Sequence, residues 1–437
     1  MLKTKIKLVQ KKPAKRSDTP PDLLAIAQYI NRYGLRGWLI RELGSAYTEA
    51  RKNKRLTHNE HDFEVCHIEY LSNLASAVLE EHYHPSSSIA FIIFEPMIRE
   101  IFAAPFIDRV VHHLLYYLNA AWWDRRFISD SYSCRRNRGT LYGVLRIQKM
   151  MREATLNGAR QAYYLKLDIR GYFMSLSREK LLERVEWGLR QQYGPYMWNP
   201  AVRKLYQLNR FLWKKVLLDD PASKARRRGP GRDWARLPVT KSLFAQLAGI
   251  GIVIGNLTSQ LVSNIFLDQL DRFIKYELGY KHYGRYVDDF IIIVPANEVD
   301  RLKADIPRIA KFLEDLGLTL HPTKRSFQSV YKGLTFLGVR ISPFCLYPSD
   351  RLQAKVTQAI ANLGKGITTY ETLNSYFGLL SHLDADKFVR RLFRRYGIDF
   401  SLYREWMVMP RERSTKDIIA EMRAQAINYR REHQNKQ

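Results

Sequence analysis

The sequence predicts an α+β fold, because strand-like and helix-like runs follow one another along 437 residues without an internal repeat. Short β-rich apolar runs indicate strands at residues 89–94, 163–168 and 290–294. Helical patterns cover residues 23–43, most of 61–165, 170–184 and 350–400. At roughly 150 residues per domain, a chain of this length should form about three structural units.

The composition is strongly basic, with 71 Lys and Arg against 43 Asp and Glu, a net charge of +28 and a pI near 9.9. A hydrophobic content of 46% excludes wholesale disorder. A polyanion is the expected partner, and charge alone does not separate nucleic acid from an anionic membrane. Because no apolar run approaches the roughly 18 to 20 residues of a membrane span, we expect a soluble protein.

The expected location is the cytoplasm. Residues 1–16 are rich in Lys and Arg but lack the apolar segment of a secretory signal. Three widely spaced cysteines, Cys66, Cys134 and Cys345, do not suggest a disulfide framework, and their use fits a reducing compartment.

Two motif-like stretches do not carry the function they suggest. Gly249–Gly255 has the wrong spacing for a dinucleotide fingerprint and lacks the acidic residue that should follow on a second strand. Cys66 and His67 lie near His58 and His61, but their spacing matches no usual zinc module, so ordinary structural roles are expected.

Three carboxylates are the strongest catalytic candidates. Asp288 and Asp289 precede the apolar run 290–294, and Asp168 ends the run 163–168. Neighbouring strand residues point to opposite faces, so a hairpin turn is needed to bring both members of the pair to one site. Three hard oxygen donors suit two magnesium ions in an in-line phosphoryl displacement. The alternative is that the acidic pair marks an ordinary turn.

Several short blocks occur in the order found in reverse transcriptases, and the chain resembles that family. The blocks are Leu167–Phe173, Gly255–Gln260, Tyr286–Asp289, Leu316–Lys324 and Phe336–Gly338. Further stretches at Arg99–His113, Asp130–Arg135 and Asn374–Gly378 extend the resemblance to about residues 85–400. One block alone is a weak match, whereas the ordered set is specific.

The resemblance implies a right-hand polymerase with mostly helical fingers, an antiparallel palm sheet and a helical thumb. The expected parts are a basic N-terminal extension at 1–60, fingers at 61–162, a palm at 163–343, a thumb at 344–400 and a tail at 401–437. Residues 191–241 are expected to be a basic palm insertion whose Gly- and Pro-containing loop, 224–232, lacks regular structure. The tail is expected to form one exposed helix that frays.

The resemblance also assigns roles to single residues. Catalytic roles fall to Asp168, Asp288 and Asp289, and metal binding to these three together with Ile169. Nucleotide binding is implied for Arg99, Phe173, Gly255, Gln260 and Lys324. The Phe173 ring would exclude a 2′-hydroxyl, and Lys324 would assist the leaving pyrophosphate. A core aromatic and a solvated lysine are the respective alternatives.

Two basic segments are candidates for nucleic-acid binding. The helix at 387–396 should bury an apolar side and expose Arg390, Arg391, Arg394 and Arg395. Membrane contact or simple solvation would produce the same pattern. The loop arginines Arg226, Arg227 and Arg228 suit RNA phosphates, and a disordered solvated loop is the alternative.

The expected activity is RNA-directed DNA synthesis with two Mg²⁺ ions, with Mn²⁺ as a substitute. Ile254 and Gln260 differ from the retroviral pattern, and the second block resembles the enzymes of diversity-generating retroelements and defence-associated reverse transcriptases. The expected partners are a dedicated structured RNA template, the cDNA product, and an accessory protein or a second copy of the chain. A non-catalytic maturase-like scaffold and template-independent or protein-primed synthesis remain alternatives.

Overall fold

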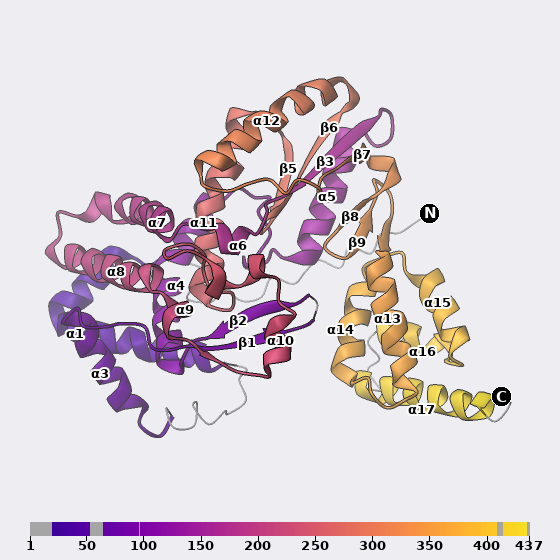
Figure 1. Ribbon diagram of the computed structural model, residues 1–437, viewed down its shortest axis with the longest axis horizontal. Helices are drawn as coiled ribbons and strands as arrows, with labels where there is room; N and C mark the ends of the chain where they lie inside the picture. The colour runs from indigo at the N-terminus through magenta and orange to yellow at the C-terminus, as the bar shows by residue number, and fades with distance from the viewer. Residues whose placement is uncertain (1–19, 53–63, 96, 409–413, 435–437) are drawn as a thin grey trace. The chain divides into compact units, whose positions relative to one another are not determined.

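The computed structural model describes residues 20–52, 64–95, 97–408 and 414–434 (Figure 1). Helices and strands both contribute, so the expected α+β class is confirmed. The chain divides into two compact units. The first comprises the described parts of Met1–Gly139, Lys166–Phe290 and Lys303–Arg325, and the second those of Thr140–Leu165, Ile291–Leu302 and Ser326–Gln437.

Helices dominate the first unit. They include α1 (Leu23–Arg51), α3 (His67–Leu79), α4 (Phe106–Arg126), α6 (Tyr172–Ser175), α7 (Arg178–Tyr193), α8 (Pro200–Leu218) and α11 (Leu257–Arg272). Helix α1 packs against α3, α4 and α8, and α7 packs against α8 and α11. Trp38, Trp123 and Trp213 from three of these helices are fully buried, so large aromatic side chains fill the centre of this unit.

Helix α1 follows its sequence signals at its start and at its kink. The Asp22 carboxylate accepts hydrogen bonds from the backbone N–H groups of Leu24 and Ala25, at 3.0 and 3.1 Å, and so caps the helix. Gly34 has a φ of 78° inside the helix, whereas Gly37 is helical. The expected interruption therefore falls at one glycine, and the helix continues beyond the expected end to Arg51.

A small sheet in the first unit corrects the prediction for residues 191–241. Strands β1 (Ile89–Ile93) and β2 (Arg99–Ala103) pair antiparallel, and β4 (Arg226–Arg227) pairs parallel with β1. Short helices α9 (Pro221–Lys224) and α10 (Gly231–Ala235) flank β4. The prediction that 224–232 lacks regular structure was wrong, because β1 supplies backbone partners: the Arg226 and Arg228 N–H groups donate to the Ser88 and Ala90 carbonyls.

A four-stranded sheet carries the candidate carboxylates. Its strands are β3 (Ala162–Asp168), β5 (His282–Tyr286), β6 (Asp289–Pro295) and β7 (Ser326–Ser329), in the order β5-β6-β3-β7. The β6 residues 290–294 are all at most 1% exposed, which explains their continuous apolar run. The predicted strands at 163–168 and 290–294 are confirmed. Helix α12 (Val299–Asp315) follows β6.

The second unit ends in a helical bundle, drawn in orange to yellow in Figure 1. Its helices are α13 (Asp350–Leu363), α14 (Tyr370–Leu380), α15 (Asp386–Arg395), α16 (Phe400–Val408) and α17 (Thr415–Gln434). Helix α5 (Thr140–Ala154) and the antiparallel strands β8 (Leu334–Phe336), β9 (Val339–Ile341) and β10 (Leu346–Pro348) belong to the same unit.

Helix α15 has the predicted amphipathic character. Val389, Leu392 and Phe393 are buried in the core of the bundle. The four expected arginines of this helix are exposed, and the Arg390 guanidinium lies over the Phe400 ring at 4.4 Å from its centroid. The predicted division of α15 into an apolar and a cationic side is therefore confirmed, while nucleic-acid contact by its arginines stays a prediction.

Helix α17 differs from the expected exposed, fraying tail. Ile418, Ile419, Met422 and Ala426 are at most 4% exposed and belong to the same core as α13 and α14. Apolar residues spaced three and four apart form one face of the helix, and the bundle buries it. The prediction of a merely exposed helix was wrong.

No helix within the described ranges is long and apolar enough to cross a membrane.

The buried pair of His112 and Thr258 leads to a pH-dependent prediction. Thr258 Oγ1 lies 2.9 Å from His112 Nδ1, joining α11 to α4, and burial lowers the pKa of His112 to about 3. The unfolded chain takes up this proton near pH 6.5, so stability is complete above that pH and declines as pH falls toward 3. We measure the free energy of unfolding in urea between pH 4.5 and 7. We expect its slope against pH to be smaller in His112→Gln than in the wild type, by the equivalent of close to one bound proton. An unchanged slope, equal to that of the exposed-residue control His433→Gln, contradicts this assignment.

Candidate active site

The tight turn between β5 and β6 positions the acidic pair. Val287 has a φ of 56°, a left-handed conformation that is rare for a β-branched residue. The turn brings Asp288 and Asp289 together at the start of β6, where Asp289 remains 29% exposed. Such an unfavourable backbone conformation persists only where its surroundings enforce it.

Arg285 supplies that enforcement from inside the protein. Its Nη1 donates to the Val287 carbonyl at 2.9 Å, while Nε and Nη2 each contact an Asp271 carboxylate oxygen at 2.7 Å. Arg285 and Asp271 are both completely buried, and the Tyr283 hydroxyl donates to Asp271 at 2.7 Å. Burial disfavours the charged guanidinium, but the Asp271 carboxylate more than offsets this and raises the pKa of Arg285. A fully formed internal ion pair therefore holds the turn.

Asp168 reaches the same site from β3. The backbone N–H of Ile169 donates to the Asp288 carbonyl at 3.3 Å, and His321 N–H donates to the Asp168 carbonyl at 2.8 Å. Gly171 follows with a φ of 57° and turns the chain into α6. These backbone contacts place the end of β3 directly beside the Asp288 turn.

The carboxylates interact electrostatically. Burial, followed by repulsion from Asp168 and Asp289, raises the pKa of Asp288 to about 6. Burial also raises the pKa of Asp289, against the opposing effect of Lys166. Burial and mutual repulsion therefore both disfavour full ionisation of the acids at this site.

Two lysines lie against the acids. Lys324 Nζ is 3.3 and 3.4 Å from the two Asp168 carboxylate oxygens, and Lys166 Nζ is 3.3 Å from Asp289 Oδ2. Lys324 was expected near the site, whereas Lys166 was not. A sequence signal for Lys166 exists, because it precedes Asp168 by two positions and so shares its face of an otherwise apolar strand.

The donor chemistry fits a divalent cation. Carboxylate oxygens are the ligands that magnesium prefers. The raised pKa of Asp288 reflects burial first and then repulsion from Asp168 and Asp289, and a bound cation would offset both effects. In the described part of the chain, no group of three or more His, Cys, Asp or Glu side chains is already arranged to hold a metal ion. The two lysine ammonium groups instead provide the positive charge next to Asp168 and Asp289.

Phe173 and Gly255 lie in a packed environment. Phe173 is partly buried against the core formed by residues such as Phe102, Leu243 and Val253. Gly255 has a φ of 126°, and a Cβ there would lie 3.2 Å from the Phe102 carbonyl oxygen. The close backbone approach that Gly255 permits in this structure is therefore to strand β2.

The other predicted contacts are spread over several elements. Gln260 is exposed within the first turns of α11, which begins at Leu257, and Arg99 is exposed at the start of β2. The Arg227 guanidinium lies over the Phe244 ring at 4.0 Å, and Arg226 is exposed beside it on β4. Arg228, which follows β4, is also exposed. The structure joins Lys324, but not these residues, to the carboxylates by a direct contact.

Comparison with known families identifies the class of protein. The family described as reverse transcriptase (RNA-dependent DNA polymerase) matches residues 98–341, which is more than half of the chain. The chain therefore belongs to the reverse transcriptase family, and the predicted right-hand polymerase class of fold is confirmed. No curated protein matches the chain.

Solved telomerases are among the similar structures. Apo telomerase from Candida tropicalis has a TM-score of 0.44 and 11% identity, covering 79% of this chain and 63% of that chain. Telomerase from Candida tropicalis with a TWJ fragment of telomeric RNA has a TM-score of 0.43 and 11% identity, covering 83% and 64%. The corresponding Candida albicans complex has a TM-score of 0.41 and 11% identity, covering 84% and 64%. The chain thus spans less than two thirds of these telomerase chains.

The buried pair yields a stability prediction. Arg285→Met leaves the Asp271 carboxylate buried without its partner, so we expect a loss of about 3–5 kcal/mol in the free energy of unfolding. Arg285→Met combined with Asp271→Leu removes both charges and should recover part of that loss, because the Val287 carbonyl and the Tyr283 hydroxyl still lose their partners. Urea unfolding of the wild type, Arg285→Met, Asp271→Leu and the double variant tests this non-additivity. Additive losses in the double variant would contradict the account of a mutually dependent pair.

Proposed function

We propose that this chain is an RNA-directed DNA polymerase that joins deoxynucleotides to a primer 3′-hydroxyl. The supporting observation is the convergence of Asp168, Asp288 and Asp289 from two strands and one tight turn, inside the region that matches the reverse transcriptase family. An ordinary acidic turn does not require a third carboxylate beside it. It also does not require a buried ion pair to hold a strained residue within the turn.

The reaction requires divalent metal, and we propose two Mg²⁺ ions, with Mn²⁺ able to replace them. Asp168, Asp288 and Asp289 would hold the ions, with the backbone carbonyl of Ile169 as a further oxygen donor. When bound, the ions would lower the pKa of the attacking hydroxyl and neutralise the charge on the triphosphate.

The remaining residues have proposed roles in positioning and charge balance. Lys324, which is 60% exposed, would leave Asp168 and neutralise charge developing on the pyrophosphate. Lys166 would keep Asp289 ionised and oriented. Arg99, Gly255 and Gln260 would contact the nucleotide, and Phe173 would exclude the 2′-hydroxyl of ribonucleotides.

The wider proposals concern organisation and biology. We propose the fingers at 61–162, the palm at 163–343 and the thumb at 344–400. From the expected extensions at 1–60 and 401–437, α1 packs on the fingers helices α3 and α4, and α16 and α17 complete the core of the thumb bundle. The loop and α15 arginines would contact nucleic acid.

The template would be a dedicated structured RNA in a phage-defence or diversity-generating system, as the Gly255–Gln260 block suggests by resemblance. An accessory protein or a second copy of the chain would complete the assembly. Sequencing the nucleic acid that co-purifies with the chain tests the identity of the template.

The metal-ligand assignment is tested by Asp288→Asn. The change keeps the side-chain volume but removes a charged oxygen ligand, so we expect nucleotide incorporation to fall by about a thousandfold or more. Primer extension on an RNA template with Mg²⁺ measures this, and Asp315→Asn on the exposed side of α12 is the matched control. Wild-type incorporation by Asp288→Asn would favour the non-catalytic scaffold.

The sugar-selection role is tested by Phe173→Val. If the ring excludes a 2′-hydroxyl, the variant should admit ribonucleotides, and the kcat/KM preference for deoxynucleotides should fall about tenfold or more. A purely structural role predicts a different outcome, in which both substrates decline together and the melting temperature drops. Unchanged sugar discrimination in a folded, active variant removes the assignment. Tyr172→Phe, at the neighbouring position, serves as the control.

A further inference from the structure

A cleft of about 910 Å³ runs along the outer face of α8, in the first unit. We call it the α8 groove and define it by its cationic and aromatic lining residues Arg203, Arg210, Phe211, Lys214, Lys215 and His84. None of these residues belongs to the carboxylate site.

Helical spacing explains why these side chains share one face. Residues 203, 207, 210, 211, 214 and 215 all line the groove and recur at intervals of three and four. Leu205, Leu212 and Trp213 point to the opposite side and are fully buried. The packing that fixes α8 in the unit therefore presents the row of cations outward.

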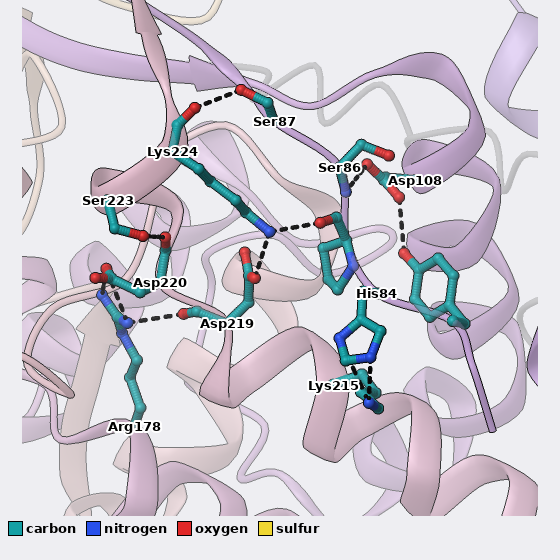
Figure 2. Close-up of polar contacts among 12 residues, drawn as sticks. His84, Ser86, Ser87, Asp108, Arg178, Lys215, Asp219, Asp220, Ser223 and Lys224 are labelled. Carbon is teal, nitrogen blue, oxygen red and sulfur yellow. Dashed lines mark hydrogen bonds and ion pairs between the residues drawn. The ribbon is translucent and has the colours of Figure 1, made fainter.

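The opposite wall of the groove is held in place by its own contacts, as Figure 2 shows. Lys224 Nζ bonds to Asp219 at 2.6 Å and to the Pro85 carbonyl, and the Lys224 carbonyl accepts from the Ser87 hydroxyl. The Ser86 N–H donates to the buried Asp108 carboxylate at 2.9 Å. The segment around His84 is thus fixed beside α8, so the groove exists before any ligand binds.

Charge in the groove favours an anion. Its lining holds three acids: Asp219 pairs with Lys224, Asp220 pairs with Arg178 at 3.3 Å, and Glu81 contributes one further negative charge. Arg210 is paired with Glu186 at 2.6 Å, so Arg203, Lys214 and Lys215 are the cations that outnumber Glu81. Lys215 Nζ lies 2.9 Å from a ring nitrogen of His84. Arg203 and Lys214 pair with no carboxylate of the described residues, and both are exposed. The groove therefore retains cations that are free to bind an anionic ligand.

The length of the cationic row indicates a polymeric ligand. Residues 203 to 215 span about 18 Å along a helix, which exceeds what the phosphates of one nucleotide would contact. Phe211 and Tyr206 line the same groove as the cations, and aromatic rings are surfaces on which bases stack. The Lys215 ammonium lies 5.4 Å from the Phe211 ring centroid, so a base would stack on the other face of that ring. An acidic peptide would satisfy the cations but would not use the rings.

We infer that the α8 groove binds a single-stranded segment of RNA outside the polymerase site. Arg203, Lys214 and Lys215 contact phosphates, and Phe211 stacks on a base. This inference rests on the proposed function only for the choice of RNA as the polyanion. The groove would hold a part of the RNA that is not being copied and so retain the template between synthesis events.

Equilibrium binding tests the groove without requiring polymerisation. A fluorescein-labelled 20-nucleotide oligouridine is titrated by anisotropy, without nucleotides or divalent metal, at several salt concentrations. Losing two phosphate contacts should reduce the slope of log affinity against log salt by about 1.4, which corresponds to roughly 25-fold weaker binding at 0.1 M salt. We expect this for Arg203→Gln combined with Lys214→Gln. The control, Lys303→Gln with Lys311→Gln on exposed positions of α12, removes equal charge and should change the slope much less.

Two further measurements make the test specific. Phe211→Leu keeps the charge and should weaken binding about tenfold with an unchanged salt slope. Photocrosslinking with 4-thiouridine RNA should label peptides from α8. Equal effects of the α8 and α12 variants, crosslinks elsewhere only, or equally effective displacement by polyglutamate would overturn the inference. If the protein binds RNA through α8 but never extends a primer, the inferred RNA-binding role of the groove is supported and the proposed polymerase function is contradicted.

Discussion

The buried pair of Arg285 and Asp271 is the interaction on which the candidate active site depends. One guanidinium satisfies both carboxylate oxygens of Asp271 at 2.7 Å and also binds the Val287 carbonyl, so helix α11 and the β5–β6 turn are tied through a single side chain. Val287 would not hold its left-handed conformation without such support. Because the turn sets the direction of Asp288 and Asp289, a structural ion pair outside the site determines the geometry of the catalytic candidates.

The site balances the negative charge of three carboxylates against the positive charge of two lysines. The pKa of Asp288 is raised to about 6 by burial and by the neighbouring carboxylates, and Lys166 and Lys324 supply compensating charge at Asp289 and Asp168. An ammonium group neutralises one charge on a flexible stem and can withdraw, whereas a divalent ion neutralises two and binds several oxygens. In our proposal, the lysines stabilise the acids until metal and nucleotide arrive.

Local sequence signals predicted the strands and the carboxylates, because β-rich runs and an acidic pair are visible without tertiary information. Asp271 could not be assigned as the partner of Arg285, since their contact joins a helix to a strand and depends on packing. Lys166 was visible in principle from its two-residue spacing to Asp168. Helix α8 was not predicted within the expected insertion at 191–241, although Leu205, Leu208 and Leu212 mark a helical face. The burial of α17 was missed because its polar residues outnumber its apolar ones. The Gly255 contact with β2 arises only from the fold.

Anomalous diffraction from crystals soaked in Mn²⁺ tests the central claim most directly, because it locates the cation independently of any activity. The account predicts a Mn²⁺ peak bound by carboxylate oxygens of Asp168 and at least one of Asp288 and Asp289, with Lys324 withdrawn from Asp168 and Arg285 still holding Val287. Mn²⁺ bound only elsewhere at saturating concentration, with the Lys166–Asp289 and Lys324–Asp168 pairs intact, would contradict it.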